Sequence, residues 1–166
     1  MSTNKLNLVS LGEFQDKNQI RALADFSNEY WDFGGWNKEA FYEDDSFPDK
    51  LQLSQVLSDT QDNVYAVLIA SKQRERYLES ALDDYLYMHK ILIHPDLRGR
   101  MIETQSVFGF MFDSVVCEGE ELGLYQQVLS VDWDNQHAIN VYSHYEFEFI
   151  SELSCGKLLM GRGFDS

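Results

Sequence analysis

The chain has 166 residues, of which 44% are hydrophobic and 14% aromatic, a composition typical of a folded domain rather than a disordered segment. Its 28 acidic and 13 basic residues give a net charge of −15, so we expect no binding to nucleic acid and none to an anionic membrane surface. The same charge favours cationic partners, although solubility alone explains it equally well.

Two cysteines, Cys117 and Cys155, lie outside any Cys-X-X-Cys or Cys/His spacing. We therefore expect neither a metal site nor a disulfide framework. The N-terminus lacks the apolar core of a signal peptide, and no apolar run approaches the roughly 20 residues of a membrane span. Because no linker-like or repeated segment interrupts the chain, we expect a single cytoplasmic domain over residues 1–166.

The first 70 residues predict two strands and several helices. Apolar residues predict a short strand over 6–11, and Asp16 is a suitable N-cap for a helix that ends near Tyr30. Residues 31–49 are aromatic, acidic and glycine-containing, which predicts a loop with a short helix over a pocket. Apolar spacing predicts a second short helix over 51–57, and a β-branched apolar run predicts a strand over 64–70.

The middle of the chain predicts a hairpin and a buried strand. A polar turn is expected at 72–75, followed by a return strand over 77–82, where a helix is the alternative. The run 85–93 is apolar over much of its length, which predicts a strand buried on both faces. Pro95 ends it, because proline cannot donate to the ladder.

The last third predicts alternating helices and strands. A broad apolar stripe predicts a helix over 102–117, followed by a strand over 125–133 and a helix over 135–145. Two final strands, 147–150 and 157–160, are expected to form a hairpin. The helix between the strands 85–93 and 125–133 favours a parallel pair with a right-handed crossover. We therefore predict an α/β fold with a mixed sheet and helices on both faces.

Two motifs carry the candidate chemistry. After Pro95, a turn with Arg98 and Arg100 leads into the predicted helix, whose unpaired N–H groups would suit a pyrophosphate. Asn135, Ala138 and Tyr142 then share one helical face after a strand. Taken singly, such a joint is a common structural feature, Asn135 is an ordinary N-cap and Tyr142 an ordinary buried aromatic. The order and separation of the two motifs are more informative than either alone.

Together, Ile93-X-Pro95-X-X-Arg98-Gly99 and Asn135-X-X-Ala138-X-X-X-Tyr142 resemble the signatures of the GNAT family of N-acetyltransferases. The resemblance implies a mostly antiparallel mixed sheet of six to seven strands flanked by helices. It also implies transfer of an acetyl group from acetyl-CoA to a primary amine by direct attack in a ternary complex. The alternative is a catalytically inactive GNAT-fold interaction module that has lost tight CoA binding.

The resemblance also assigns roles to individual residues. Tyr142 would be the general acid that protonates the departing thiolate, and Asn135 would help to fix the pantetheine arm. The backbone of Ile91, Leu92 and Ile93 would pair with pantetheine. The pyrophosphate would be held by the main-chain amides of Arg98, Gly99, Arg100, Met101, Ile102 and Glu103. Met101 and Glu103 replace small residues of the family turn, and a carboxylate near the pyrophosphate opposes its binding.

The general base and the acceptor pocket are less well determined. Strand alternation places Tyr87, His89, Ile91 and Ile93 on one face, so His89 is the best-placed base, Glu79 is its competitor, and a packed histidine is the alternative role. The resemblance places the acceptor, a small amine or a peptide N-terminus or lysine, near residues 31–49. The residues expected to bind it are Trp36, Phe41, Tyr42, Glu43, Asp44 and Asp45, and an acidic surface loop is the alternative. Homodimers are common in the family.

Overall fold

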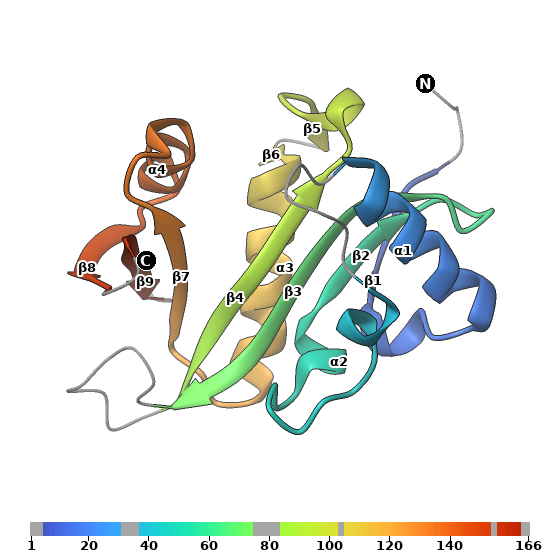
Figure 1. Cartoon of the computed structure of the whole chain (residues 1–166), viewed down its shortest axis with the longest axis horizontal. Coiled ribbons are helices and arrows are strands. Elements are labelled where there is room, and N and C mark those ends of the chain that lie inside the picture. Colours follow the sequence, from blue (N-terminus) through green and yellow to red (C-terminus); the bar gives the residue numbers. More distant parts are fainter. Residues whose placement is uncertain (1–4, 31–36, 75–83, 103–104, 154–155, 164–166) are drawn as a thin grey trace.

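The computed structural model describes residues 5–30, 37–74, 84–102, 105–153 and 156–163. Their central element is a seven-stranded sheet with the order β1-β2-β3-β4-β7-β9-β8 (Figure 1). The strands are β1 (Asn7–Ser10), β2 (Gln55–Ser58), β3 (Val64–Arg74), β4 (Asp84–Ile93), β7 (Gln126–Asp132), β8 (Glu148–Glu152) and β9 (Lys157–Gly163). Neighbours pair antiparallel except β4 and β7, which are parallel. The predicted mixed sheet and its single parallel pair are confirmed.

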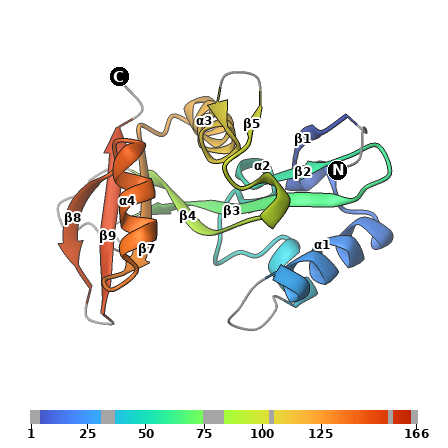
Figure 2. The same ribbon diagram turned by 90° about the horizontal axis from the view of Figure 1, so that it is seen from above.

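Helices cover both faces of this sheet. The α-helices are α1 (Lys17–Tyr30), α2 (Lys50–Leu53), α3 (Val107–Glu121) and α4 (Gln136–His144), and short 3₁₀ turns span Leu11–Glu13, Lys38–Phe41 and Pro95–Leu97. Figure 2 shows α3 on one face of the central strands and α1 on the other. No helix in the described part of the chain is long and apolar enough to cross a membrane.

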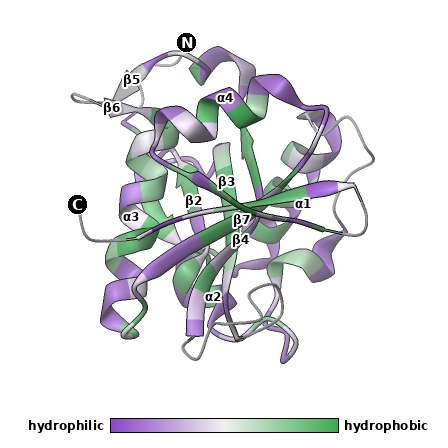
Figure 3. Ribbon diagram, turned by 90° about the vertical axis from the view of Figure 1, so that its left-hand side faces the viewer, coloured by the Kyte–Doolittle hydropathy of each residue, from purple (hydrophilic) through white to green (hydrophobic). Residues whose placement is uncertain are grey.

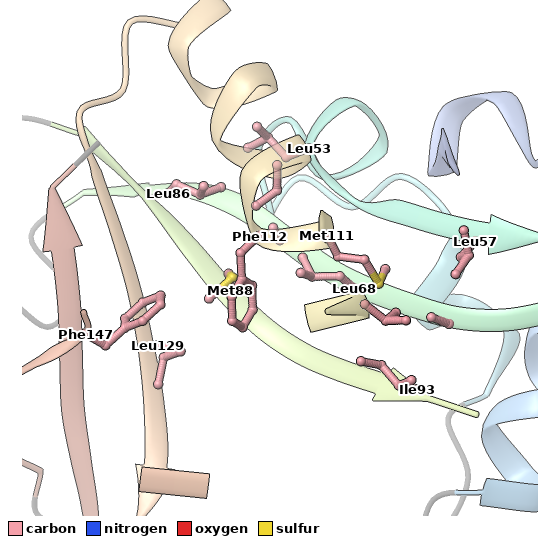
Figure 4. Close-up of a cluster of buried hydrophobic side chains, with 14 of the residues drawn as sticks. Leu53, Leu57, Leu68, Leu86, Met88, Ile93, Met111, Phe112, Leu129 and Phe147 are labelled. Carbon is pink, nitrogen blue, oxygen red and sulfur yellow. The ribbon is translucent and has the colours of Figure 1, made fainter. Parts of the chain in front are cut away.

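The core has one large cluster on each face of the sheet. Alternation along β4 sends Ile93 into the cluster beneath α3 and Leu92 into the cluster beneath α1. Figure 4 shows the first cluster, in which Met111 and Phe112 of α3 face the strands. Hydrophobic colour accordingly dominates the central strands, and hydrophilic colour marks the ends of several elements (Figure 3).

Two sequence predictions in the first half were wrong. The predicted helix 51–57 is split, because α2 ends at Leu53 and residues 55–58 form β2. All four residues of β2 are buried, so it lacks the alternation that distinguishes a strand from a helix. The turn expected at 72–75 was also wrong, since β3 continues to Arg74. The return strand expected over 77–82 lies outside the described residues.

The helix α3 begins later and ends later than the helix predicted over 102–117. Two short strands, β5 (Met101–Ile102) and β6 (Gln105–Ser106), instead pair antiparallel before it. The helix begins after Ser106, whose hydroxyl accepts a hydrogen bond from the Gly109 N–H at 3.1 Å and caps it. It then continues to Glu121, past the point at which it was expected to end. The later strand, helix and hairpin were predicted within a few residues.

Candidate functional site

The candidate site is a cleft between the two parallel strands. Only three residue pairs join β4 to β7, and the last is Met88 with Leu129. Beyond this pair the strands diverge (Figure 1), and a cavity of about 380 Å³ lies between them. Residues 90–93 keep their pairing with β3 on the other side. Their backbone groups on the cleft side are therefore outside any strand ladder and can pair with an extended ligand.

The cavity is lined by both strands and by one face of α4. Its lining residues are Met88, His89, Lys90, Ile91, Phe112, Leu129, Ser130, Val131, Asp132, Asn135, Ala138, Tyr142 and Lys157. The structure thus brings His89, Ile91, Asn135 and Tyr142 together, although they are far apart in the sequence. The side chains of Leu92 and Ile93 pack instead into the two cores, which leaves only their backbone for a ligand.

Tyr142 reaches the cavity from α4, a helix with no fully buried residue. Its ring packs 6.3 Å from Phe112 and 6.0 Å from Phe147, between ring centroids. This burial raises the pKa of the Tyr142 hydroxyl above its ordinary value, because ionisation would place a charge in a poorly solvated position. The hydroxyl is therefore protonated at neutral pH, as a proton donor requires.

The start of α4 is fixed by its own cap. The side-chain oxygen of Asn135 accepts a hydrogen bond from the Ala138 N–H at 3.2 Å. Asn135 is thus an N-cap, as its structural alternative role predicted, and it also lines the cavity. One side chain therefore stabilises the helix and contributes to the wall of the cleft.

His89 occupies a β-bulge, and this corrects the predicted alternation. Ile69 pairs with Lys90 and Ala70 pairs with Met88, so His89 is the extra residue of β4. An inserted residue shifts the alternation by one position. Tyr87 consequently packs in a small separate cluster, whereas Ile93 packs beneath α3, so the two do not share a face as expected.

A short chain of polar groups fixes the His89 ring. His89 Nε2 lies 2.6 Å from Ser71 Oγ, and the Gln73 side-chain amide donates to the same oxygen at 2.8 Å. The edges of two aromatic rings pack against the imidazole, with centroid distances of 4.7 Å for Phe47 and 4.8 Å for Tyr87. These contacts hold one ring orientation at the cavity wall. The competing base, Glu79, lies outside the described residues.

The turn after β4 differs from the expected phosphate cradle. The Arg98 side chain donates from Nε to the Ile93 carbonyl at 3.1 Å, and Gly99 adopts a φ of +78°, which glycine tolerates without strain. Met101 and Ile102 belong to β5 rather than to a helix start. The helix start predicted at Ile102 was therefore wrong, because this residue pairs with Gln105 instead, whereas the binding of a pyrophosphate by the amides of this turn stays a prediction. Glu103 lies outside the described residues, and Arg100 is exposed.

The predicted acceptor segment is only partly in place. Trp36 lies outside the described residues, and Phe41 is fully buried beneath α1, so it is a core residue and cannot line a pocket. Tyr42 is exposed. Glu43, Asp44 and Asp45 line a separate hollow of about 330 Å³ that shares no lining residue with the cleft.

Several residues of the site were missed in the sequence, and four of them are polar groups that line the cavity or hold His89. Lys90 and Lys157 line the cavity, and Ser71 and Gln73 support His89. Ser71 and Gln73 have the i, i+2 spacing of one strand face, which was a weak signal. Their contact with His89 depends on the register of two strands and on the bulge, so no local pattern reveals it.

No protein-family model matches the sequence, and no curated protein matches it. Solved structures match over nearly the whole chain. The ribosomal-protein-S18-alanine N-acetyltransferase of Escherichia coli has a TM-score of 0.65 and 16% identity, covering 98% of this chain and 96% of that one. A GNAT-family acetyltransferase of Listeria monocytogenes has a TM-score of 0.67 and 16% identity, covering 96% of this chain and 95% of that one. Naa50 of Arabidopsis thaliana, in complex with the bisubstrate analogue CoA-Ac-MVNAL, has a TM-score of 0.65 and 10% identity, covering 96% of this chain and 99% of that one.

Proposed function

Because the chain has the GNAT fold, we propose that it is an N-acetyltransferase that moves an acetyl group from acetyl-CoA to a primary amine. The observation that carries this proposal is the divergence of β4 and β7 after Met88, which opens a cavity beside Tyr142. An inactive relative could keep the fold without keeping this cavity open. The cavity volume of about 380 Å³ suits the acetylated end of the donor, with the nucleotide outside it.

The donor is held mainly by backbone groups. The cleft-facing edge of Ile91, Leu92 and Ile93 is free of β7, so its backbone groups can pair with the two amides of the pantetheine arm, apart from the Ile93 carbonyl, which accepts a hydrogen bond from Arg98 Nε. Asn135 lies across the cavity from this edge, on the β7 side. The pyrophosphate lies toward the turn after β4, where Arg98 and Arg100 supply positive charge.

The transfer uses one proton acceptor and one proton donor. The amine nitrogen forms a bond to the acetyl carbon, and the carbon–sulfur bond of the thioester breaks. His89 accepts the proton that the amine loses, and Tyr142 gives a proton to the departing thiolate. A backbone N–H near Ile93 stabilises the negative charge that develops on the acetyl oxygen. His89 and Tyr142 line the same cavity, as this division of roles requires.

The acceptor is a primary amine on a small molecule or on a peptide. Two of the structural counterparts carry names that refer to a ribosomal-protein alanine and to a peptide-bearing bisubstrate analogue, which supports including a peptide N-terminus.

A second candidate is a GNAT-fold interaction module that does not turn over acetyl-CoA. One observation favours it: the paired strands β5 and β6 occupy the position where the predicted helix would have offered its first amides to the pyrophosphate. Ser106 also accepts the Gly109 N–H, which removes one further donor from the start of α3.

Calorimetric titration with acetyl-CoA separates the two candidates. We expect saturable binding by the unmodified protein, and the absence of heat at millimolar acetyl-CoA would favour the interaction module. Tyr142→Phe is expected to keep acetyl-CoA affinity in this titration and, in a separate turnover assay with an amine, to lower kcat by roughly 10²-fold, the usual contribution of one proton donor. Tyr125→Phe is the matched control, because Tyr125 is exposed and does not line the cavity. Unchanged kcat in Tyr142→Phe would remove Tyr142 from its assigned role.

A further inference from the structure

A second hollow lies at the end of α1, beside the start of β3. Its volume is about 380 Å³, and none of its lining residues lines the cleft between β4 and β7. The lining residues are Ala22, Asp25, Phe26, Glu29, Tyr30, Asn63, Val64, Tyr65 and His94. One face of α1, the turn before β3 and the residue that follows β4 therefore enclose it. The proposed acetyl transfer makes no use of this hollow.

Aromatic rings form a continuous wall of the hollow. The His94 ring lies 4.7 Å from Tyr30, 5.8 Å from Tyr65 and 6.4 Å from Phe26, between centroids. Phe26 and Tyr30 are themselves 5.3 Å apart. His94 is held in place because its Nδ1 accepts the Asp96 N–H at 3.0 Å. Aromatic faces gathered in this way attract cations through the negative charge density of the rings.

Carboxylates supply negative charge beside the rings. Asp25 and Glu29 are four residues apart, so they lie on the same side of α1, and both are exposed. Within the described part of the chain, neither forms an ion pair with a lysine or arginine. Burial, then the charge and hydrogen bond of Glu29, and last the charge of Asp96 raise the pKa of the Tyr30 hydroxyl above its ordinary value. The hollow therefore combines aromatic rings with two carboxylates that pair with no lysine or arginine among the described residues.

We propose that this hollow binds an organic cation, specifically an alkylammonium group. Rings recognise a cation with methylene or methyl groups better than a hydrated metal ion, which requires several oxygen or nitrogen ligands at once. The described residues contain no cluster of three side chains that could hold a metal ion. A free polyamine and the lysine side chain of a peptide both supply the required group. The net charge of −15 draws either of them toward the protein.

Calorimetric titration of the full chain tests the proposal with three probes: tetramethylammonium chloride, spermidine and a short acetylated peptide with one lysine. Tetramethylammonium reports on the rings, because it cannot donate hydrogen bonds. Tyr65→Leu removes a ring and is expected to weaken tetramethylammonium binding about two- to five-fold. Tyr65→Phe keeps the ring while removing the hydroxyl that donates to Asp59 at 3.3 Å, and it should retain the binding. Tyr125→Leu removes an exposed ring outside the hollow and should have no effect.

The charge is tested separately with Glu29→Gln, which should weaken spermidine binding and reduce its dependence on salt concentration. Circular dichroism confirms that each variant is folded. Tighter binding of the peptide than of spermidine would identify a lysine as the source of the ammonium group, and the reverse would identify a free polyamine. The proposal is overturned if no probe binds saturably at tens of millimolar. It is equally overturned if Tyr65→Leu and Tyr65→Phe bind tetramethylammonium with the same affinity as the unmodified protein.

Discussion

Arg162 connects α4 to the sheet, and its replacement tests how the candidate site is held together. Its Nε donates to the Gln127 side-chain oxygen at 2.7 Å, and Nη1 donates to the Tyr145 carbonyl at the end of α4 at 2.9 Å. The guanidinium lies 5.0 Å from the ring centroid of Phe147. A second nitrogen, Nη2, is 3.7 Å from Asp113. Arg162→Met keeps an apolar chain of similar length and removes all of these polar contacts.

The expected cost follows from the burial of each partner. Gln127 is fully buried, so leaving its oxygen without this donor costs about 1–3 kcal/mol. The Tyr145 carbonyl adds about 1 kcal/mol, and the cation–π contact with Phe147 adds about 0.5–1 kcal/mol. Asp113 is 57% exposed, and its ion pair adds little. Relief of the desolvated guanidinium offsets part of the sum, so we expect a net loss of about 2–4 kcal/mol.

Urea denaturation followed by circular dichroism measures this loss as a change in the free energy of unfolding. For a chain of this size, the corresponding fall in Tm is about 5–15 °C. Asp113→Asn is the control and should change stability by less than about 1 kcal/mol. Gln127→Leu combined with Arg162→Met should cost less than the sum of the two single substitutions, because the double variant leaves no orphaned amide. A loss below about 1 kcal/mol in Arg162→Met would refute the reasoning.

Three further predictions concern single side chains. The raised pKa of Tyr142 contributes stability that is present below about pH 10 and is lost as the pH rises through the folded-state pKa. Above pH 10, the free energy of unfolding measured in urea should therefore fall less steeply with pH in Tyr142→Phe than in the unmodified protein. Lys50 is 4% exposed, its Nζ lies over the Phe47 ring, and burial lowers its pKa. Lys50→Met should therefore raise the free energy of unfolding at pH 7 by up to about 1 kcal/mol. A clear decrease in that free energy would contradict this. If the chain acetylates amines, Ser71→Ala should lower kcat about ten- to hundred-fold with acetyl-CoA affinity unchanged. An unchanged kcat would show that Ser71 does not position His89.

The later elements of the chain were predictable because their signals are local. The apolar run that became β4 ends at Ile93, two residues before the proline that was expected to end it. Asn135 was expected to cap a helix, and its side chain makes that hydrogen bond. Caps and prolines act on their immediate neighbours, so their effects can be predicted without knowledge of the rest of the molecule.

The start of α3 was missed because the residues before Val107 can either begin a helix or pair as short strands. Ile102 extends the apolar stripe of the helix, so the pattern favoured including it. In the structure Met101 and Ile102 pair with Ser106 and Gln105, and the helix begins only after Ser106, which caps it. A two-residue hairpin leaves almost no trace in hydrophobic periodicity, so the sequence alone could not separate the two outcomes.

The sequence by itself determined the order and type of most elements and the two motifs that resemble the GNAT signatures, because periodicity, caps and breakers act within a few residues. Only the tertiary structure decided where β4 leaves β7, that His89 occupies a bulge beside Ser71, and that His94 joins Tyr30 and Tyr65 at a second hollow. These features depend on strand register and on contacts between distant segments. Shifting a strand pair by one residue would change all of them while leaving every local pattern intact.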